Sequence, residues 1–260
     1  MNQFTEQELA YFHRDGFLAV KGLIDRALVD QITAVTDQAV AEKIEPVEYE
    51  SQVGYPGAPK SLDAPGGRTI RRLLQAIGRH PVFTELAIHP PILARLRQLL
   101  GSEIVLPLAH HNCIMVKDRR FSSATGWHRD FRYWRFERPE LITVLLALNE
   151  ATATNGCLQF LPGSHTFTPD PEQLDETEFF RADLPRNKPW LDRATLALMA
   201  PGDVVFFHCR TFHGAGRNLG GEPRKSVLFT YRSADNPPIP GTRSASQPEL
   251  LLHPPAPPVT

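Results

Sequence analysis

The chain has 260 residues and a formal net charge of −1, which favours one large domain and gives no electrostatic footprint for nucleic acid or an anionic membrane. Its N-terminus lacks a basic region followed by a continuous apolar stretch, and no apolar run approaches the ~20 residues that span a bilayer. Three scattered cysteines in apolar runs favour buried, reduced thiols over a disulfide or a zinc site, so we expect a cytoplasmic protein.

Residues 1–103 are predicted to be mostly helical. Thr5 begins a capping box and a short helix that ends near Gly16, and a brief strand is expected at Phe17–Val20. Asp25 caps a second helix, whose apolar side chains fall on one face.

The rest of this N-terminal part contains one long loop and two more predicted helices. Residues 46–67 are rich in Pro and Gly, and loops of that length inside a compact domain are often functional. Helices are expected around residues 69–79 and 82–100, the second interrupted at Pro90-Pro91 and closed by Gly101.

From about residue 104 the sequence changes to short β-branched or apolar runs separated by turn residues. The predicted strands are Ile104–Lys117, Gly126–Tyr133, Leu141–Asn149, Cys157–Leu161, Thr195–Met199, Val204–Cys209 and Lys225–Arg232. This pattern indicates a mainly β fold with flanking helices, in which two sheets form a jelly roll over residues 104–235. The helical N-terminal part would buttress it within a single domain spanning residues 1–260.

Two segments lie outside the predicted strands. Residues 166–194 form a charged, Pro-punctuated insertion, which is a candidate lid. Residues 236–260 form a Pro-rich tail, to which the sequence assigns no chemistry.

The strongest candidates for chemistry are His128 and Asp130. Side chains two residues apart on a strand share a face, so this pair offers an imidazole and a carboxylate to one ion. A structural histidine is the alternative, but a buried carboxylate without a partner is strongly disfavoured. With a second histidine from a distant strand, the pair would form the facial triad of non-haem Fe(II) oxygenases.

Two histidines compete for the third ligand position. His208 and His213 differ by five residues, so they would face opposite ways on an unbroken strand. His213 precedes Gly214-Ala215-Gly216, where a bare backbone lets a ligand approach closely. We therefore choose His213 as the ligand and assign His208 to the core or to the surroundings of the site.

Arg224 is the candidate anchor for a co-substrate. It follows His213 by eleven residues, across a loop closed by Gly220–Pro223, and antiparallel pairing would return it beside the metal. Its guanidinium suits the distal carboxylate of a dicarboxylate, which it can grip through two parallel hydrogen bonds. A surface arginine is the alternative, but Arg224 opens an apolar strand.

Several motifs in this order resemble the phytanoyl-CoA dioxygenase family, a branch of the Fe(II)/2-oxoglutarate oxygenases. They are Tyr11-Phe12-x-x-Asp15-Gly16-Phe17, Trp127-His128-Arg129-Asp130-Phe131, Asn155-Gly156-Cys157-Leu158, Leu161-Pro162-Gly163-Ser164-His165, Gly202–His208, and His213-Gly214-x-Gly216-x-Asn218 with Arg224. The resemblance covers nearly the whole chain.

This resemblance implies a double-stranded β-helix that binds Fe(II), with 2-oxoglutarate and O2 as co-substrates. It assigns the iron to His128, Asp130 and His213 and the 2-oxoglutarate to Arg224. The activity implied is hydroxylation of an unactivated C–H bond with release of succinate and CO2. Alternatives are a hydroxylase of acyl-CoA thioesters and a non-catalytic 2-oxoglutarate-binding module.

The chain departs from the family at Ala215, where a family member has a serine that helps to hold 2-oxoglutarate. Ser226, two residues along from Arg224 and on the same strand face, is the expected substitute. Arg71 or Arg72, near a family lysine that faces the co-substrate, is a further candidate for cofactor binding. A surface arginine on a helix is the alternative for either residue.

The substrate is expected to be a small polar or anionic metabolite or an amino acid. If the strand that carries His128 continues regularly, Arg132 and Trp134 share its face and look into the pocket. Arg132 would then bind an anionic group, and Trp134 matches a tryptophan that lines the substrate site of a family member. The alternative is that the strand ends at Phe131 and that Arg132 is solvated.

Overall fold

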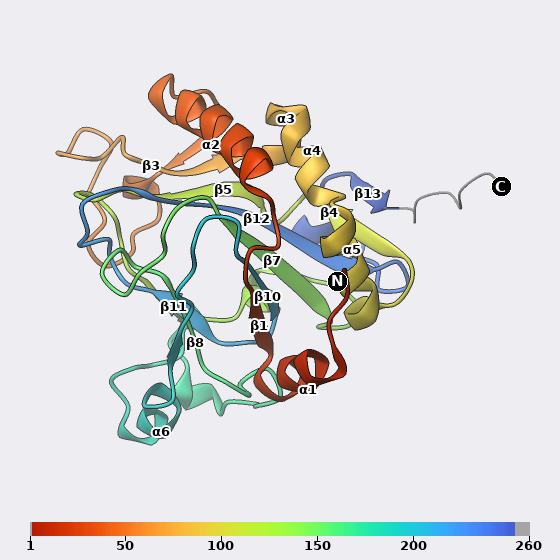
Figure 1. Cartoon of the computed structure of the whole chain (residues 1–260). Helices are drawn as coiled ribbons and strands as arrows, with labels where there is room; N and C mark the ends of the chain where they lie inside the picture. The colour runs from red at the N-terminus through yellow and green to blue at the C-terminus, as the bar shows by residue number, and fades with distance from the viewer. Residues whose placement is uncertain (1, 253–260) are drawn as a thin grey trace.

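The structure is a computed structural model that describes residues 2–252 (Figure 1). Its N-terminal part begins as predicted, with α1 (Glu6–Asp15), β1 (Phe17–Val20) and α2 (Arg26–Ala41). The Thr5 side chain accepts from the backbone N–H of Glu8 in a capping box, which satisfies a backbone donor that the first helical turn leaves open.

The prediction of a helix over residues 69–79 is wrong. Residues Ile70–Leu74 form strand β3, and only Ala76–Arg79 form one helical turn, α3. Strand β3 pairs with β2 (Val47–Tyr49) on one side and with β5 (Asn112–Lys117) on the other, so long-range pairing overrides the local helical tendency. The break at Pro90 is confirmed, because the helical region divides into α4 (Pro81–Ala87) and α5 (Pro90–Leu100).

Short strands are the main regular elements in the rest of the described chain. The remaining strands are β4 (Ile104–Pro107), β5 (Asn112–Lys117), β6 (Thr125–His128), β7 (Leu141–Ala147), β8 (Leu158–Phe160), β9 (Thr195–Leu196), β10 (Val204–His208), β11 (His213–Ala215), β12 (Arg224–Ser233) and β13 (Glu249–Leu252). The remaining helical elements are α6 (Lys188–Leu191) and five short 3-10 turns: η1 (Glu50–Gln52), η2 (Asp130–Tyr133), η3 (Pro171–Gln173), η4 (Pro185–Asn187) and η5 (Arg243–Ala245).

Two of the predicted strands differ from the structure. The strand expected over residues 104–117 is two strands, β4 and β5. The strand expected over residues 126–133 ends at His128 and gives way to η2. Strand β13, which pairs with β4, lies in the segment predicted to be a Pro-rich tail.

Within residues 2–252 the strands form two antiparallel sheets. The major sheet has the order β1-β10-β7-β12-β5-β3-β2, and β4 pairs with β12 on one side and with β13 on the other. The minor sheet has the order β6-β11-β8-β9. The predicted fold class, a jelly roll with helices on its N-terminal side, is confirmed. Strands β1, β2 and β3 of the N-terminal part are integral to the major sheet, so that part does more than buttress it.

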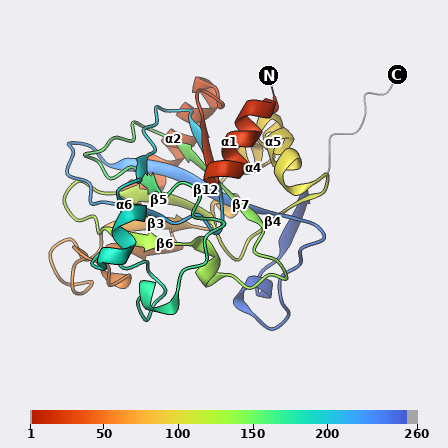
Figure 2. The same cartoon turned by 90° about the horizontal axis from the view of Figure 1, so that it is seen from below.

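The major sheet has two different faces because its side chains alternate. One face, which includes Val144, Phe206 and Val227, packs against the helices. The other, which includes Leu145 and Leu228, faces the minor sheet. Figure 2 shows α2, α4 and α5 on one side of β7 and β12, and β6 on the other side. The interior between the two sheets is therefore the place where a site can form.

Among the residues that the structure describes, no helix is both long enough and apolar enough to cross a membrane.

Candidate metal and co-substrate site

Three potential metal ligands meet between the sheets. Pairing of β6 with β11 sets His128 directly opposite His213, and Asp130 begins the η2 turn that follows β6. The ligand atoms of the three residues lie within 4.8 Å of one another. Oδ1 of Asp130 is 3.5 Å from Nε2 of His213 and 4.0 Å from Nε2 of His128. All three side chains are buried.

Each histidine ring is oriented by its own backbone. Nδ1 of His128 lies 2.9 Å from the carbonyl oxygen of Gly126, and Nδ1 of His213 lies 3.0 Å from that of Thr211. A carbonyl oxygen can only accept, so each Nδ1 carries the proton and each Nε2 is left as a lone-pair donor. Both Nε2 atoms face Asp130, which is the arrangement that a shared metal ion requires.

The carboxylate of Asp130 has one satisfied and one unsatisfied oxygen. Oδ2 accepts from the Thr143 hydroxyl at 3.0 Å, and Thr143 in turn contacts the Thr230 hydroxyl at 3.0 Å. Oδ1 is buried and, among the described residues, has no hydrogen-bond partner. An uncompensated buried oxygen is costly, and a cation removes the cost.

The charge states of these three side chains also favour binding of a metal cation. Burial, followed by the charge of His213, lowers the pKa of His128 to about 3. Burial alone would raise the pKa of Asp130, but His111, the two histidine ligands and the Thr143 hydrogen bond together lower it. Two neutral imidazoles and one ionised carboxylate are the donor set of an Fe(II) facial triad, so these residues fit that metal.

The structure groups His213, rather than His208, with the other two ligands. The ring of His208 lies 5.6 Å from that of His165, and its Nδ1 accepts from the backbone N–H of Arg210. Gly214 has a different role from the one predicted. A Cβ there would meet the carbonyl oxygen of Thr125 at 3.1 Å, so the bare backbone allows β11 to lie close to β6.

The inner face of β12 carries the predicted co-substrate residues. Arg224 and Ser226 are both buried, and within the described part of the chain Nε of Arg224 and Oγ of Ser226 have no hydrogen-bond partner. Thr230, which contacts Thr143 beside Asp130, lies further along the same face. The inner face of β12 therefore carries the unpartnered donors of Arg224 and Ser226 at one end and, at the other, Thr230, which lies beside Asp130.

Arg72 lies in the same row of the sheet as Ser226, because both pair with Met115. It belongs to a strand and not to the helix expected from sequence. Nε of Arg72 is 3.2 Å from the Met115 sulfur and 3.5 Å from Oε1 of Glu48. The structure therefore places Arg72 on the inner face of the major sheet, beside the interior between the two sheets.

Lys117 is a buried cation that sequence reasoning missed. It pairs with Arg224 across β5 and β12, and its Nζ donates to the carbonyl oxygen of Ser123 at 2.7 Å. Burial, then the charges of Arg224 and Arg71, lower the pKa of Lys117 to about 7. Strand parity with Cys113 and Met115 was the signal that could have revealed its inward direction.

A cavity of about 690 Å³ opens beside the triad and includes His128 and Asp130 in its wall. Two other wall residues that the sequence did not suggest are His111 and Arg243. Nδ1 of His111 lies 3.6 Å from Oδ2 of Asp130. Arg243 comes from the segment predicted to be a Pro-rich tail, so that segment contributes to the site.

Trp134 and Arg132 do not share a face, because β6 ends at His128 and η2 follows. Trp134 is 2% exposed and lines the cavity, with its ring 5.3 Å from that of His111. Arg132 does not line this cavity: its guanidinium lies 3.9 Å over the ring of Phe179 and faces a second, smaller cavity. The prediction that both look into one pocket is wrong in this respect.

Residues 46–67 were predicted to be one long loop, but β2 and η1 occupy residues 47–52. The rest of that loop and the insertion over residues 166–194 each place an aromatic ring near the site. Tyr55 lines the cavity, and its hydroxyl is 3.2 Å from that of Tyr133. The ring of Phe179, from the insertion, lies 5.7 Å from that of His128 and 5.8 Å from that of Tyr55. These segments therefore meet above the triad.

Comparisons with known proteins agree with this geometry. The model of the family described as phytanoyl-CoA dioxygenase (PhyH) matches residues 12–226. The ectoine dioxygenase of Streptomyces avermitilis is 28% identical over 267 residues, which cover 95% of this chain and 85% of that protein.

Solved structures share the fold. The non-heme alpha ketoglutarate dependent epimerase SnoN from nogalamycin biosynthesis has a TM-score of 0.69 at 26% identity, covering 88% of this chain and 83% of its own. EctD from S. alaskensis, solved with 2-oxoglutarate and 5-hydroxyectoine, has a TM-score of 0.73 at 22% identity, covering 91% and 78% respectively.

Proposed function

The chain belongs to the phytanoyl-CoA dioxygenase family, and we propose that it hydroxylates an unactivated C–H bond of a small polar or anionic metabolite. The observation that carries this proposal is the buried cluster of His128, Asp130 and His213, in which Oδ1 of Asp130 lacks a partner among the described residues. Fe(II) bound there, with 2-oxoglutarate and O2, supplies the oxidising chemistry and yields succinate and CO2.

The protein's own contribution at the metal is orientation. The backbone carbonyls of Gly126 and Thr211 hold the two histidine rings, and the Thr143 hydroxyl holds Oδ2 of Asp130. Such supporting hydrogen bonds keep the ligand atoms turned towards one point before the metal arrives, which reduces the cost of forming the site.

Arg224 and Ser226 bind the distal carboxylate of 2-oxoglutarate in this proposal. This assignment is supported by Nε of Arg224 and Oγ of Ser226, which are buried and without a hydrogen-bond partner among the described residues. A carboxylate supplies acceptors for both. Lys117, opposite Arg224, adds a second positive charge to this pocket when it is protonated. Arg72, in the row of Ser226, is part of the cavity wall, and we assign it to co-substrate binding as well.

The cavity wall favours a polar substrate over a long hydrocarbon. Arg72, His110, His111 and Arg243 all contribute to it, and an alkyl chain would leave these polar groups without partners. Trp134 supplies a flat apolar surface on which the substrate rests. Relatives named ectoine dioxygenase are consistent with a small-metabolite substrate, whereas the acyl-CoA alternative would have to place its hydrocarbon against this polar wall.

We propose a cytoplasmic location because Cys113, Cys157 and Cys209 are all buried free thiols, as expected in a reducing compartment.

A substrate screen tests the proposal. The purified protein is incubated with Fe(II), 2-oxoglutarate and O2 against a panel of polar metabolites, amino acids and acyl-CoA thioesters, while succinate and product mass are followed together. We expect substrate-dependent succinate and a product heavier by one oxygen atom, both lost in His213→Ala.

Other outcomes of this screen would contradict the proposal. Substrate-dependent succinate with a product of unchanged mass would replace hydroxylation by a reaction such as epimerisation, the activity in the name of SnoN. Binding of 2-oxoglutarate without any succinate would favour the non-catalytic alternative.

A further inference from the structure

A second cavity, of about 350 Å³, lies on the other side of η2 from the cavity beside the triad. Four arginines line it: Arg129, Arg132, Arg135 and Arg210. The first three come from η2 and its flanks, and the fourth from the turn after β10. Glu178 is the single carboxylate in its lining. The lining therefore carries a clear excess of positive charge.

These four charges are not neutralised by ion pairs within residues 2–252. Arg129 donates to the carbonyl oxygens of Ser164 and Phe167, and Arg135 donates to that of Trp134 at 2.9 Å. Neutral carbonyls satisfy hydrogen bonds but supply no negative charge, and Asp175 attracts Arg132 without forming an ion pair with it. Nε of Arg129 and Nη1 of Arg132 are buried and, in the described part of the chain, have no hydrogen-bond partner.

Arg138, only three residues beyond Arg135, differs because its charge is neutralised by ion pairs. Its guanidinium is 2.9 Å from Oε2 of Glu140 and 2.8 Å from Oδ1 of Asp235. An arginine close to the cavity in the sequence thus has two carboxylate partners, whereas no ion pair within residues 2–252 involves the four arginines that line the cavity.

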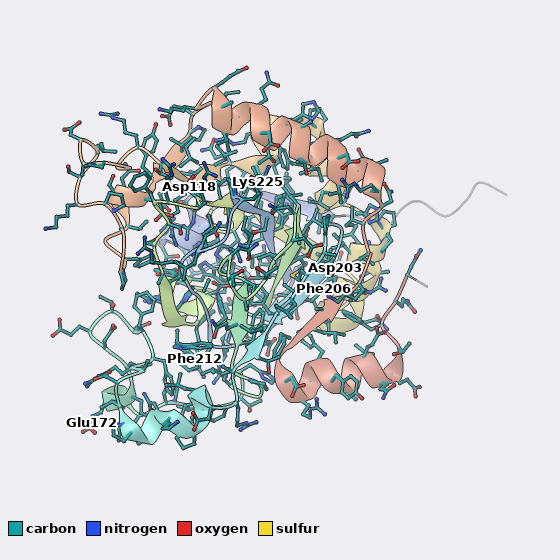
Figure 3. All side chains as sticks on the ribbon, turned by 60° about the vertical axis from the view of Figure 1, so that its left-hand side comes forward. Asp118, Glu172, Asp203, Phe206, Phe212 and Lys225 are labelled. Atoms are coloured by element: carbon teal, nitrogen blue, oxygen red, sulfur yellow. The ribbon has the colours of Figure 1, made fainter. Side chains whose placement is uncertain are left out.

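Aromatic rings hold two of the guanidinium groups in place. Arg129 lies 4.2 Å over the ring of Phe212, and Arg132 lies 3.9 Å over that of Phe179. Figure 3 shows Phe212 between the body of the protein and the segment that carries Glu172. The donors are therefore arranged in advance, which lowers the entropic cost of binding an anion.

Like charges are held close together in this cavity. Arg129 and Arg210 both line it, so two guanidinium charges face the same small space. An anion between the two arginines would relieve both the repulsion and the lack of hydrogen-bond acceptors.

We propose that this cavity binds a phosphoryl group. A single carboxylate matches one guanidinium fork and one charge, whereas a phosphoryl group brings up to two charges and three acceptor oxygens to several arginines at once. The phosphoryl group belongs either to the substrate of the neighbouring cavity or to a separate ligand. The rings of Tyr133 and Phe179 each contact both Arg132 and His128, so they lie between the two cavities.

This inference does not rest on the proposed reaction, because its test needs no turnover. Inorganic phosphate is titrated calorimetrically, at constant ionic strength, into the full chain loaded with Ni(II) and saturated with 2-oxoglutarate. The saturating 2-oxoglutarate occupies the pocket of Arg224. We expect one phosphate to bind in the wild type, and about 10- to 100-fold weaker binding in the variant Arg135→Gln/Arg210→Gln.

The matched control is Arg138→Gln, which removes a nearby arginine that already has acidic partners and should leave phosphate affinity unchanged. Arg135→Gln alone is a second test variant, because Arg135 is exposed and its side chain bonds only neighbouring carbonyls. Thermal melting checks that each variant is folded. Absence of phosphate binding in the wild type, or equal affinity in the wild type and the double variant, would overturn the proposal.

A turnover assay with the substrate from the screen then separates the two sources. Phosphate that competes with the substrate, raising KM at constant kcat, assigns the cavity to a phosphoryl group on the substrate. Phosphate that binds without competing assigns the cavity to a separate phosphorylated ligand.

Discussion

The metal ligands and the residues assigned to 2-oxoglutarate lie on opposite walls of one interior, and they are held in place differently. The metal wall is built from the short strands β6 and β11, of 4 and 3 residues, and from the turn that begins at Asp130. The co-substrate wall is built from β12 and β5, of 10 and 6 residues. On the metal wall, the pairing of β6 with β11 brings the two histidines together, but individual hydrogen bonds orient the ligand side chains. On the co-substrate wall, the register of β12 with β5 sets the positions.

Substitutions in the two walls should therefore have different effects. On the metal wall, loss of one supporting hydrogen bond should change how well the site binds its ion. On the co-substrate wall, the sheet keeps every backbone position whatever the side chain, so a substitution should change only charge and hydrogen bonding. Substitutions in the metal wall should therefore lower iron affinity, and substitutions in the co-substrate wall should lower the affinity for 2-oxoglutarate.

The largest effect is expected from the metal wall itself. Asp130→Ala removes the only carboxylate of the cluster and should abolish Fe(II)-dependent succinate formation, because the triad loses its charge-compensating ligand. Metal content of the purified variant is the check. An Asp130→Ala protein that keeps wild-type turnover would show that the iron is bound elsewhere.

The next effect is expected on the co-substrate wall. Arg224→Ala should raise the KM for 2-oxoglutarate by one to two decades, because a charge-assisted bidentate contact contributes roughly 1.5–3 kcal/mol. Iron affinity should stay near that of the wild type. Arg224→Lys is the matched control, since it keeps the charge but loses the planar fork, and its KM should fall between the two. An unchanged KM in Arg224→Ala would move the anchor elsewhere.

Thr143→Val tests the supporting hydrogen bond on the metal wall. The change keeps the shape of the side chain but removes the donor to Oδ2 of Asp130, and loss of such a partner weakens metal binding by about tenfold or more. The KM for 2-oxoglutarate at saturating iron should not change. Thr143→Ser restores the hydroxyl and should recover the affinity, which separates orientation from simple packing. Equal iron affinity in all three proteins would contradict this role.

The smallest effect concerns Lys117. Its pKa of about 7 means that it loses its charge as pH rises from 7 towards 9, and with it an attraction for the distal carboxylate. We expect the KM for 2-oxoglutarate to rise about fivefold over that range, equivalent to ~1 kcal/mol. Lys117→Met should have a higher KM at pH 6.5 and should lack this rise. A wild-type profile as flat as that of the variant would contradict it.

Lys117 also affects stability, with a defined sign. Between its folded pKa of about 7 and its ordinary value of 10.5, the unfolded chain holds a proton that the folded chain does not, so stability rises with pH across this window. The cost of burying the charge is fully present below pH 7. Lys117→Met should therefore be stabilised most at low pH, which thermal melting as a function of pH will show.

The residues that the sequence predicted best are those whose direction follows from strand parity. Arg224 and Ser226 were expected on one face of a strand, and the structure places both on the inner face of β12. The helix caps at Thr5 and Asp25 could also be predicted from the sequence, because capping depends on residues only three positions apart.

Other parts of the site depend on contacts that sequence alone does not show. Residues 70–74 are a strand because β5 pairs with them, and this pairing puts Arg72 inside the sheet. Arg132 turned away because the chain enters a 3-10 turn directly after β6. Arg243 lies in the cavity wall in a segment that is held by the pairing of β13 with β4 and by the hydrogen bond from the backbone N–H of Arg135 to the Ser244 hydroxyl. In each case a long-range or turn geometry decided where a side chain points.

The central claim is that His128, Asp130 and His213 together hold one Fe(II). An anaerobic titration of Fe(II) into the wild type, His213→Ala and His208→Ala tests it most directly, since the two histidines are five residues apart and only one is grouped with the ligands. We expect one equivalent of tightly bound Fe(II) in the wild type and in His208→Ala, and none in His213→Ala. Retention of iron by His213→Ala together with its loss from His208→Ala would show that His208 is the ligand instead.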